Sequence, residues 1–241
     1  MGSVPKFEVI IPVINSILAD VLIKNMEENS LLPKRVIIID NSSDHYMPWS
    51  DKFLIEIYHS QTGMVNESIN LGISKVTKYC DFVSILNDDI QIGPWFFERV
   101  ARAFKEDPIC SVVCPTTFVS PGRNPKVSHR RMTLGKNGKA PLKEGPFLLH
   151  QMSKKQGWSL TFRKKVLDIV PKIPNTRIET FHGDDWFWLW TTKYIGMHWC
   201  VDSGNSIYHM IGQSTLKLGK RKDKKKEHNE YMKILEELRN K

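Results

Sequence analysis

Hydrophobic residues fall in short, near-continuous runs over the first 115 residues of the chain. Three of these runs are rich in β-branched residues and cover 7–13, 35–40 and 82–87. Such runs are typical of strands that are buried on both faces of a mainly parallel sheet. A further short strand is predicted at 53–58.

Apolar residues between these runs recur at helical spacing. The predicted helices carry their stripes on Ile17, Leu18, Val21, Leu22 and Met26, on Ile69, Ile73 and Val76, and within 95–104. Strands and helices therefore alternate up to a last strand near 115, which predicts a Rossmann-like α/β half. Ligands bind beyond the carboxyl ends of strands in such sheets, so Pro12, Asp40 and 87–89 are the residues to examine.

The pattern is interrupted between 118 and 146, where Gly, Pro, Ser, Asn and Lys dominate. A loop of this length is either a functional lid or a disordered segment. Beyond it we expect strands at 147–151, 159–162, 198–201 and 206–209, and helices at 163–170, 184–194 and 227–239.

Composition is that of a soluble globular protein, with 41% hydrophobic and 25% charged residues among 241. No apolar run reaches the roughly 18 residues that a membrane helix needs, and 7–14 is too short for a signal peptide. The four cysteines at 80, 110, 114 and 200 show no zinc-binding spacing. We expect them to be reduced and packed, in a soluble cytoplasmic protein.

The formal net charge of +9 is concentrated near the C-terminus. Residues 217–226 contain seven basic side chains and one acid, Asp223. This tract is either a solvated tail or a contact for phosphates on nucleic acid or an anionic membrane surface.

Two acidic motifs stand at predicted element ends. Asn87-Asp88-Asp89 follows the third apolar run, and carboxylates there can hold Mg²⁺ or Mn²⁺, although turns also favour Asp. Gly183-Asp184-Asp185-Trp186 opens a predicted helix, where the acids can also serve as simple capping residues.

Two further signals are individually modest. His209 ends a short β run ahead of a Gly and two hydroxyl residues, and is either structural or a ligand to metal or phosphate. Asp40 begins the segment Asp-Asn-Ser-Ser-Asp and either binds a nucleoside or starts an Asx-turn.

The order of these motifs resembles the GT-A-fold glycosyltransferases of family two. That order is Ile-Ile-Pro-Val, Ile-Ile-Asp-Asn-Ser-Ser, Asn-Leu-Gly-Ile, Leu-Asn-Asp-Asp, Gly-Asp-Asp-Trp and Tyr-His-x-x-Gly-x-Ser-Thr, over roughly 6–216. The resemblance implies a glycosyltransferase domain at 1–216, with a nucleotide-sugar half at 1–115 and an acceptor half at 116–216. A basic tail with a C-terminal helix then covers 217–241.

The resemblance also implies where the donor binds. Pro12 and Asp40 would line the pocket for the base, while Asn66 and Asn70 would lie near the base and diphosphate. Asn87-Asp88-Asp89 stands in place of the family's Asp-x-Asp motif. Asn87 replaces its first acid, and Ile69 replaces an Arg that is common in the family.

The implied chemistry is an inverting, metal-dependent transfer of one sugar. Asp89 would bind Mn²⁺ or Mg²⁺, Asp88 would contact the ribose or the metal, and His209 would bind the metal or the diphosphate. Asp185 matches the catalytic base and Asp184 is its acidic neighbour. The Gln/Arg-x-x-Arg-Trp ending of processive synthases is absent, which favours a single addition.

The acceptor is left open by the residues. Trp158 would lie on the acceptor side, and Trp158 and Trp186 are aromatics that can stack on a sugar or a base. Family habit favours a UDP-sugar donor. Hydroxymethylated DNA is the acceptor favoured by the basic tract, and a cell-surface or lipid-linked glycan is the alternative. Two hypotheses from other functional classes remain. The chain could be a non-catalytic nucleotide- or nucleic-acid-binding module, or a nucleotidyltransferase.

Overall fold

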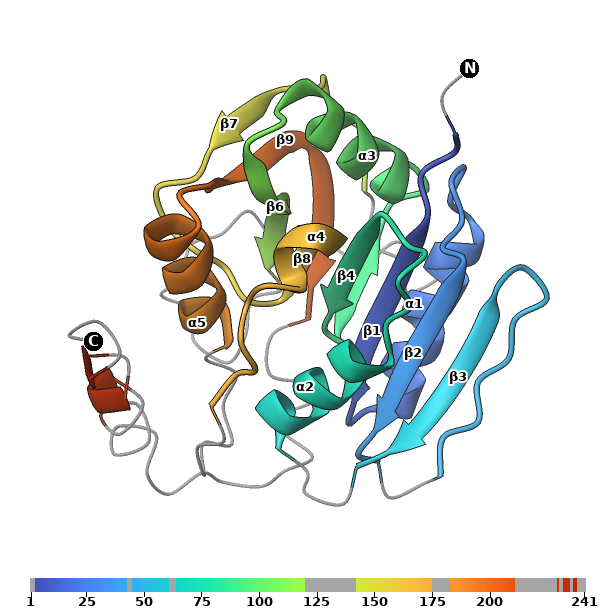
Figure 1. The fold of residues 1–241 in the computed structure, drawn as a ribbon. Coiled ribbons are helices and arrows are strands. Elements are labelled where there is room, and N and C mark those ends of the chain that lie inside the picture. The colour runs from blue at the N-terminus through green and yellow to red at the C-terminus, as the bar shows by residue number, and fades with distance from the viewer. Residues whose placement is uncertain are drawn as a thin grey trace.

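The computed structural model describes residues 3–42, 45–60, 64–119, 142–174 and 183–210, and also 229, 232–234 and 236–237. These residues form a nine-stranded sheet with helices on both faces (Figure 1). The elements in chain order are β1 (Phe7–Val13), α1 (Ser16–Glu27), β2 (Arg35–Asp40), β3 (Leu54–His59), α2 (Val65–Lys75), β4 (Phe82–Leu86), β5 (Ile90–Ile92), α3 (Phe96–Glu106), β6 (Cys110–Val119), β7 (Leu149–Gln151), β8 (Ser159–Arg163), α4 (Lys164–Leu167), α5 (Gly183–Leu189), a π-helical turn (Trp190–Tyr194) and β9 (His198–His209).

The sheet has the order β3-β2-β1-β4-β8-β6-β9-β5, and β7 pairs with β9. The pairings give β1, β2, β3, β4, β6 and β9 one direction and β5, β7 and β8 the other. The predicted α/β class with a mainly parallel sheet is therefore confirmed. We call the side where the six parallel strands end the carboxyl edge, and the opposite side the amino edge.

Each face of the sheet is covered by its own apolar core. On one face, α1 packs on β1 and β5 and α3 packs on β6 and β9, and Phe82 of β4 stacks on Phe104 of α3 with ring centroids 4.6 Å apart. On the other face, α2, α4 and α5 cover the sheet, and Phe187 of α5 meets Phe162 at 4.7 Å. The close approach of α2 to β1 requires Gly72, since a Cβ there would overlap the side chain of Ile10.

Several predicted boundaries differ from the structure. The two strands expected at 198–201 and 206–209 are the single strand β9, and the short strand β5 was not predicted. Strand β6 continues through Phe118 and Val119, so the loop expected at 118–146 begins later, and 120–141 lie outside the described residues. The helix expected at 184–194 becomes α5 followed by the π-helical turn.

Other expectations fall partly on the described chain. Residues 229, 232–234 and 236–237 are helical, as predicted for 227–239, while 211–228 lie outside the described residues. All four cysteines are free and buried, as expected. In the part of the chain that the structure describes, no helix has both the length and the apolar character needed to cross a membrane.

A buried charge network ties the first strands together at the amino edge. Arg35 Nη2 donates to Glu8 Oε2 at 2.8 Å, and Arg35 Nη1 donates to Glu56 at 2.9 Å. Glu8 is 1% exposed and also accepts hydrogen bonds from the backbone and hydroxyl of Thr77. Three strands and the segment after α2 therefore share one buried ion network.

Substituting Glu8→Gln should destabilise the fold by about 3 kcal/mol, because it removes one charge from a buried pair and leaves Arg35 under-neutralised. Urea unfolding followed by circular dichroism measures this loss. The matched control is Glu106→Gln, since Glu106 pairs with Arg102 at 3.9 Å on the surface. The control should change stability by less than about 0.5 kcal/mol. Equal losses in the two variants would contradict the prediction.

Candidate functional site

Asp89 and His209 meet at the carboxyl edge. Ile90 of β5 pairs with His209 of β9, and the Met210 amide donates to the Asp89 carbonyl at 2.8 Å. This pairing places Asp89 Oδ1 3.2 Å from His209 Nε2, with both side chains buried. Neither Asp89 Oδ1 nor His209 Nδ1 has a hydrogen-bond partner among the described residues. A carboxylate and an imidazole, both metal-ligand types, thus lie together with bonding capacity to spare.

Trp158 packs beside the Asp89–His209 pair. Its ring centroid lies 5.0 Å from that of His209, and its indole Nε1 donates to Thr117 Oγ1 at 2.7 Å. The Trp158 carbonyl accepts a hydrogen bond from the amide of Asn87 at 3.0 Å. Asn87, Asp89, Trp158 and His209 are consequently held in one cluster by β4, β5, β8 and β9.

Asp88 holds the neighbouring loop. Its Oδ2 accepts hydrogen bonds from the amides of Ile14 and Asn15 at 2.8 and 2.7 Å, just before α1 begins. The turn that follows Pro12, itself buried in β1, is therefore fixed against the acidic motif. The structure gives Asp88 this positioning contact, and its predicted contact with ribose or metal stays a prediction.

Asp40 at the end of β2 organises its own turn. Its Oδ1 accepts hydrogen bonds from the amide and hydroxyl of Ser42 at 2.8 and 2.6 Å, and its Oδ2 accepts from the Tyr46 amide at 3.2 Å. His59 Nδ1 lies 3.2 Å from the same Oδ2. The Asx-turn reading of Asp40 is thus realised, and its role toward a base stays a prediction.

The two predicted asparagines of α2 differ. Asn70 forms two hydrogen bonds with the backbone of Ile173, at 2.8 and 2.9 Å. Its side-chain amide therefore holds the segment around Ile173 against α2. Asn66 is 1% exposed, yet neither its Oδ1 nor its Nδ2 has a partner among the described residues. Buried polar groups are rarely left unsatisfied, so Asn66 fits the predicted donor contact better than Asn70 does.

The second acidic motif begins α5. In Figure 1, α5 joins β9 at the amino-edge side, so its first residues face the carboxyl edge. Burial raises the pKa of Asp184, while the nearby Lys155 ammonium acts to lower it. Lys155 Nζ lies 3.9 Å from Asp184 Oδ2 and also contacts Asp185 Oδ1. Lys155 therefore contacts both acids of the motif.

Sequence reasoning missed Lys155. It belongs to the segment 155–158, in which Gln156 Nε2 donates to the Pro115 carbonyl at 3.0 Å and Trp158 faces His209. This segment therefore contacts both acidic motifs. The only signal in the sequence is a polar Lys-Gln-Gly immediately before Trp158.

Trp186 requires a correction. It is 3% exposed, lies in the core beneath α5, and its indole Nε1 donates to the Pro171 carbonyl at 2.8 Å. Its ring centroid is 5.8 Å from that of Trp190, one helical turn later. This burial argues against the predicted contact with an acceptor, and Trp158 is the aromatic residue placed at the site.

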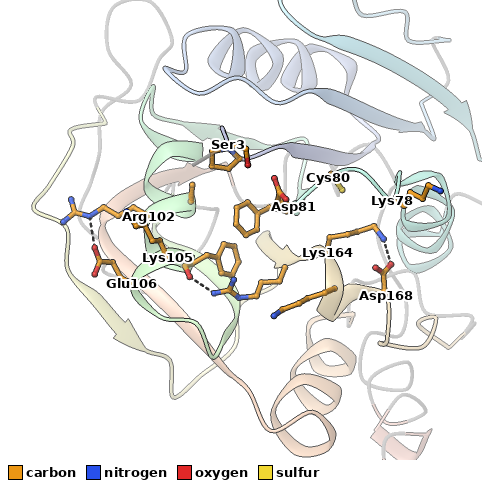
Figure 2. A pocket seen from close by; sticks show the side chains of 15 residues that line it. Ser3, Lys78, Cys80, Asp81, Arg102, Lys105, Glu106, Lys164 and Asp168 are labelled. Carbon is orange, nitrogen blue, oxygen red and sulfur yellow. Dashed lines mark hydrogen bonds and ion pairs between the residues drawn. The ribbon is translucent and has the colours of Figure 1, made fainter. Parts of the chain in front are cut away.

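A cavity of about 840 Å³ (Figure 2) opens at the amino edge, on the side of the sheet opposite Asp89 and His209. Phe82 and Phe104 contribute apolar surface to it, and Lys78, Arg102 and Lys105 are among its basic lining residues. Two of its lining cations pair with acids one turn away, Arg102 with Glu106 and Lys164 with Asp168. The cavity lies at the wrong end of the strands for a donor site, since ligands of such sheets bind at the carboxyl ends.

Solved structures share this fold at low identity. The structure of S. aureus TarS 1–349 in complex with UDP-GlcNAc matches with a TM-score of 0.64 and 17% identity, covering 90% of this chain and 62% of that one. A longer S. aureus TarS structure matches with a TM-score of 0.63 and 15% identity, covering 92% of this chain and 41% of that one. The chain thus spans 62% and 41% of the length of these two TarS chains, and the likeness shows the fold.

A search of curated proteins finds no matching sequence. The family model for "Glycosyl transferase family 2" matches residues 8–168, which include β1 through α4 and the Asn87-Asp88-Asp89 motif. With most of the described sheet inside this match, the chain belongs to glycosyltransferase family 2.

Proposed function

We propose that this protein transfers a single sugar from a UDP-sugar to an acceptor hydroxyl with inversion, and that UDP-GlcNAc is the first donor to test. The observation that carries the proposal is the buried Asp89–His209 pair with unpartnered polar atoms, joined through segment 155–158 to Asp184 and Asp185. UDP-GlcNAc is the ligand of the similar S. aureus TarS 1–349 structure, which supports this choice of donor.

The donor would lie along the carboxyl edge. Asn66 offers an amide with free donor and acceptor atoms, which suits the hydrogen-bonding edge of uracil. Asp88 fixes the turn after β1, and Asp40 fixes the turn after β2, so the two loops that would flank the nucleotide are pre-organised. Such pre-organisation limits the entropy lost when the donor binds.

The donor set of Asp89 and His209 fits a divalent metal of the Mn²⁺ or Mg²⁺ class. Both residues are buried, 3.2 Å separates the carboxylate from the imidazole, and oxygens of a diphosphate would supply further ligands. When bound, such an ion stabilises the charge that develops on the leaving diphosphate. Trp158 shields this corner from water on one side through its contact with His209.

Asp185 is proposed as the general base. Its carboxylate would accept the proton of the acceptor hydroxyl while that oxygen attacks the anomeric carbon, and the bond to the diphosphate breaks on the opposite face. Lys155 contacts the carboxylates of both Asp185 and Asp184 and so fixes their position at the start of α5. The side chains of Asp184 and Asp185 are 16% and 20% exposed, so the start of α5 is partly shielded from water.

The acceptor proposed is a hydroxyl of a glycan. The comparisons give no support to a DNA acceptor, and the basic tract at 217–226 on which that prediction rested lies outside the described residues. Hydroxymethylated DNA is therefore kept as one arm of the test below.

Wild-type protein should release UDP from UDP-GlcNAc in the presence of Mn²⁺, with a higher rate when a suitable acceptor is added. Asp185→Asn should lower transfer by about 10²–10⁴-fold, because the base is lost, while donor binding is retained. The assay follows free UDP with glycan acceptors and with hydroxymethylated DNA. Asp168→Asn, at the amino edge, is the matched control and should behave as wild type. Stimulation by DNA alone would overturn the glycan proposal, and near wild-type transfer by Asp185→Asn would overturn the base assignment.

Asp89→Asn and His209→Gln should each weaken Mn²⁺-dependent binding of UDP by at least about tenfold, since each removes a metal-ligand group. Calorimetric titration of UDP with and without Mn²⁺ measures the effect. In the absence of metal, the variants and the wild type should bind UDP with similar, weak affinity. A wild-type protein whose affinity for UDP is independent of Mn²⁺ would contradict the metal assignment.

Lys155→Met should move the acidic limb of the kcat–pH profile to higher pH. Lys155 acts to lower the pKa of the buried Asp184, and it contacts Asp185, so its loss favours protonation of the acid pair. Activity that needs an ionised base is then lost at a higher pH as the solution is acidified. The neighbouring Lys154→Met is the control. An acidic limb that stays in place, with kcat lowered equally at every pH, would show that Lys155 does not act through the acids.

A further inference from the structure

A second cluster of metal-ligand side chains lies at the amino edge, away from the site described above. Asp107 follows α3, and His198 and Cys200 are alternate residues of β9, so they project from the same face of the strand. One ligand atom from each lies within 4.8 Å of the other two. A carboxylate, an imidazole and a thiol from sequence-distant segments are thus gathered at one point.

The Asp107 carboxylate is oriented by its own backbone. Its Oδ1 accepts hydrogen bonds from the amides of Ile109 and Cys110, both at 3.1 Å. This turn leaves Oδ2 directed at the cluster, 2.7 Å from His198 Nε2 and 3.4 Å from Cys200 Sγ. Hydrogen bonds that fix a ligand oxygen in this way are the usual outer support of a metal centre.

A second thiol adjoins the cluster. A hydrogen bond with the Cys110 thiol, burial and the Asp107 carboxylate raise the pKa of the Cys200 thiol. The register shift between Cys110 and Val112 in the β6–β9 pairing occurs at this point. Cys200 is 1% exposed, whereas the side chains of His198 and Asp107 are 20% and 25% exposed. The sulfur ligand Cys200 therefore lies inside, and solvent reaches the site from the imidazole and carboxylate side.

We propose that Asp107, His198 and Cys200 bind a zinc-class divalent ion as its three protein ligands. Tetrahedral Zn²⁺ takes nitrogen, sulfur and oxygen ligands at about 2.0–2.3 Å, which sets ligand atoms roughly 3.3–3.7 Å apart. The 3.4 Å between Asp107 and Cys200 already matches this spacing. The Asp107–His198 contact of 2.7 Å is a hydrogen bond, and it would lengthen slightly when the metal displaces its proton to solvent.

The two ends of the sheet would then select different metals. Thiolate and imidazole ligands favour zinc, whereas the carboxylate-based site at Asp89 favours Mn²⁺ or Mg²⁺ with diphosphate oxygens. The amino-edge ion would have no contact with the donor, and its place is structural. It would join the end of α3 to the starts of β6 and β9, which are distant in sequence and carry much of the acceptor half.

Cobalt provides the direct test on the full-length protein. After removal of metal with a chelator, one equivalent of Co²⁺ should produce a thiolate-to-cobalt charge-transfer band in the near ultraviolet, and Zn²⁺ should displace it. His198→Gln and Cys200→Ser should remove the band or lower affinity for Zn²⁺ by at least about 100-fold in a competition with a chromophoric chelator. Cys80→Ser is the matched control. Cys80 is also a buried cysteine, but it lies outside the cluster and donates a hydrogen bond to the Thr77 carbonyl.

The result stays decisive even if Cys200→Ser folds poorly, since His198 is partly exposed and its substitution can be read alone. Loss of the band in His198→Gln with retention in Cys80→Ser supports the site. Absence of a thiolate band at one equivalent of Co²⁺, or an unchanged band in His198→Gln, would overturn it. UDP release is not used as the readout, so the outcome is independent of the proposed transferase activity.

Discussion

The candidate site depends on the shared direction of β4, β6 and β9. Strand β8 runs between β4 and β6 in the opposite direction, so both of its neighbours end at the carboxyl edge, and β9 follows β6 in parallel. The acidic motif after β4 and His209 at the end of β9 are thereby brought to the same edge. The antiparallel pairing of β5 with β9 then fixes Asp89 against His209 at 3.2 Å.

Buried polar atoms without hydrogen-bond partners distinguish the candidate residues that suit contact with a ligand from those that are already engaged. Asn66, Asp89 and His209 each keep at least one buried side-chain atom without a hydrogen-bond partner among the described residues. Leaving such a group unsatisfied costs about 1–3 kcal/mol, a cost that binding of a polar ligand would relieve. Asp40, Asn70 and Asp88 instead form hydrogen bonds that fix turns or clamp a loop. These two groups separate ligand contact from positioning.

The parallel half of the fold could be predicted from sequence because three of its strands are near-continuous apolar runs. Strand β5 could not be predicted, since three residues carry too little pattern and its identity depends on pairing with β9. Strand β9 was divided in the prediction because its middle is polar. In the structure, Asp202 is buried there by a two-point contact with Arg99 at 2.7 and 2.8 Å, and Gly204 leaves no room for a side chain beside Pro146.

The site, like the strands, could be predicted where the sequence carries a pattern and not where only the folded chain makes the contact. The order of the motifs indicated that Asp89 and His209 belong to one site, although no local pattern places them together. Trp186 was misread because its place one turn before Trp190 is equally the spacing of a core stripe, and the structure buries it. Lys155 could not be found, since its contact with Asp185 is made only by the folded chain.

The four residues 155–158 connect the parts of the proposed mechanism. Gln156 anchors this segment to β6, Trp158 packs on His209, and Lys155 contacts Asp185. Only Gln156 and Gly157 separate Lys155 from Trp158, so one short anchored segment positions both the ammonium group beside Asp185 and the indole beside His209. The placement of the proposed base and that of the proposed metal ligand therefore depend on the same four residues.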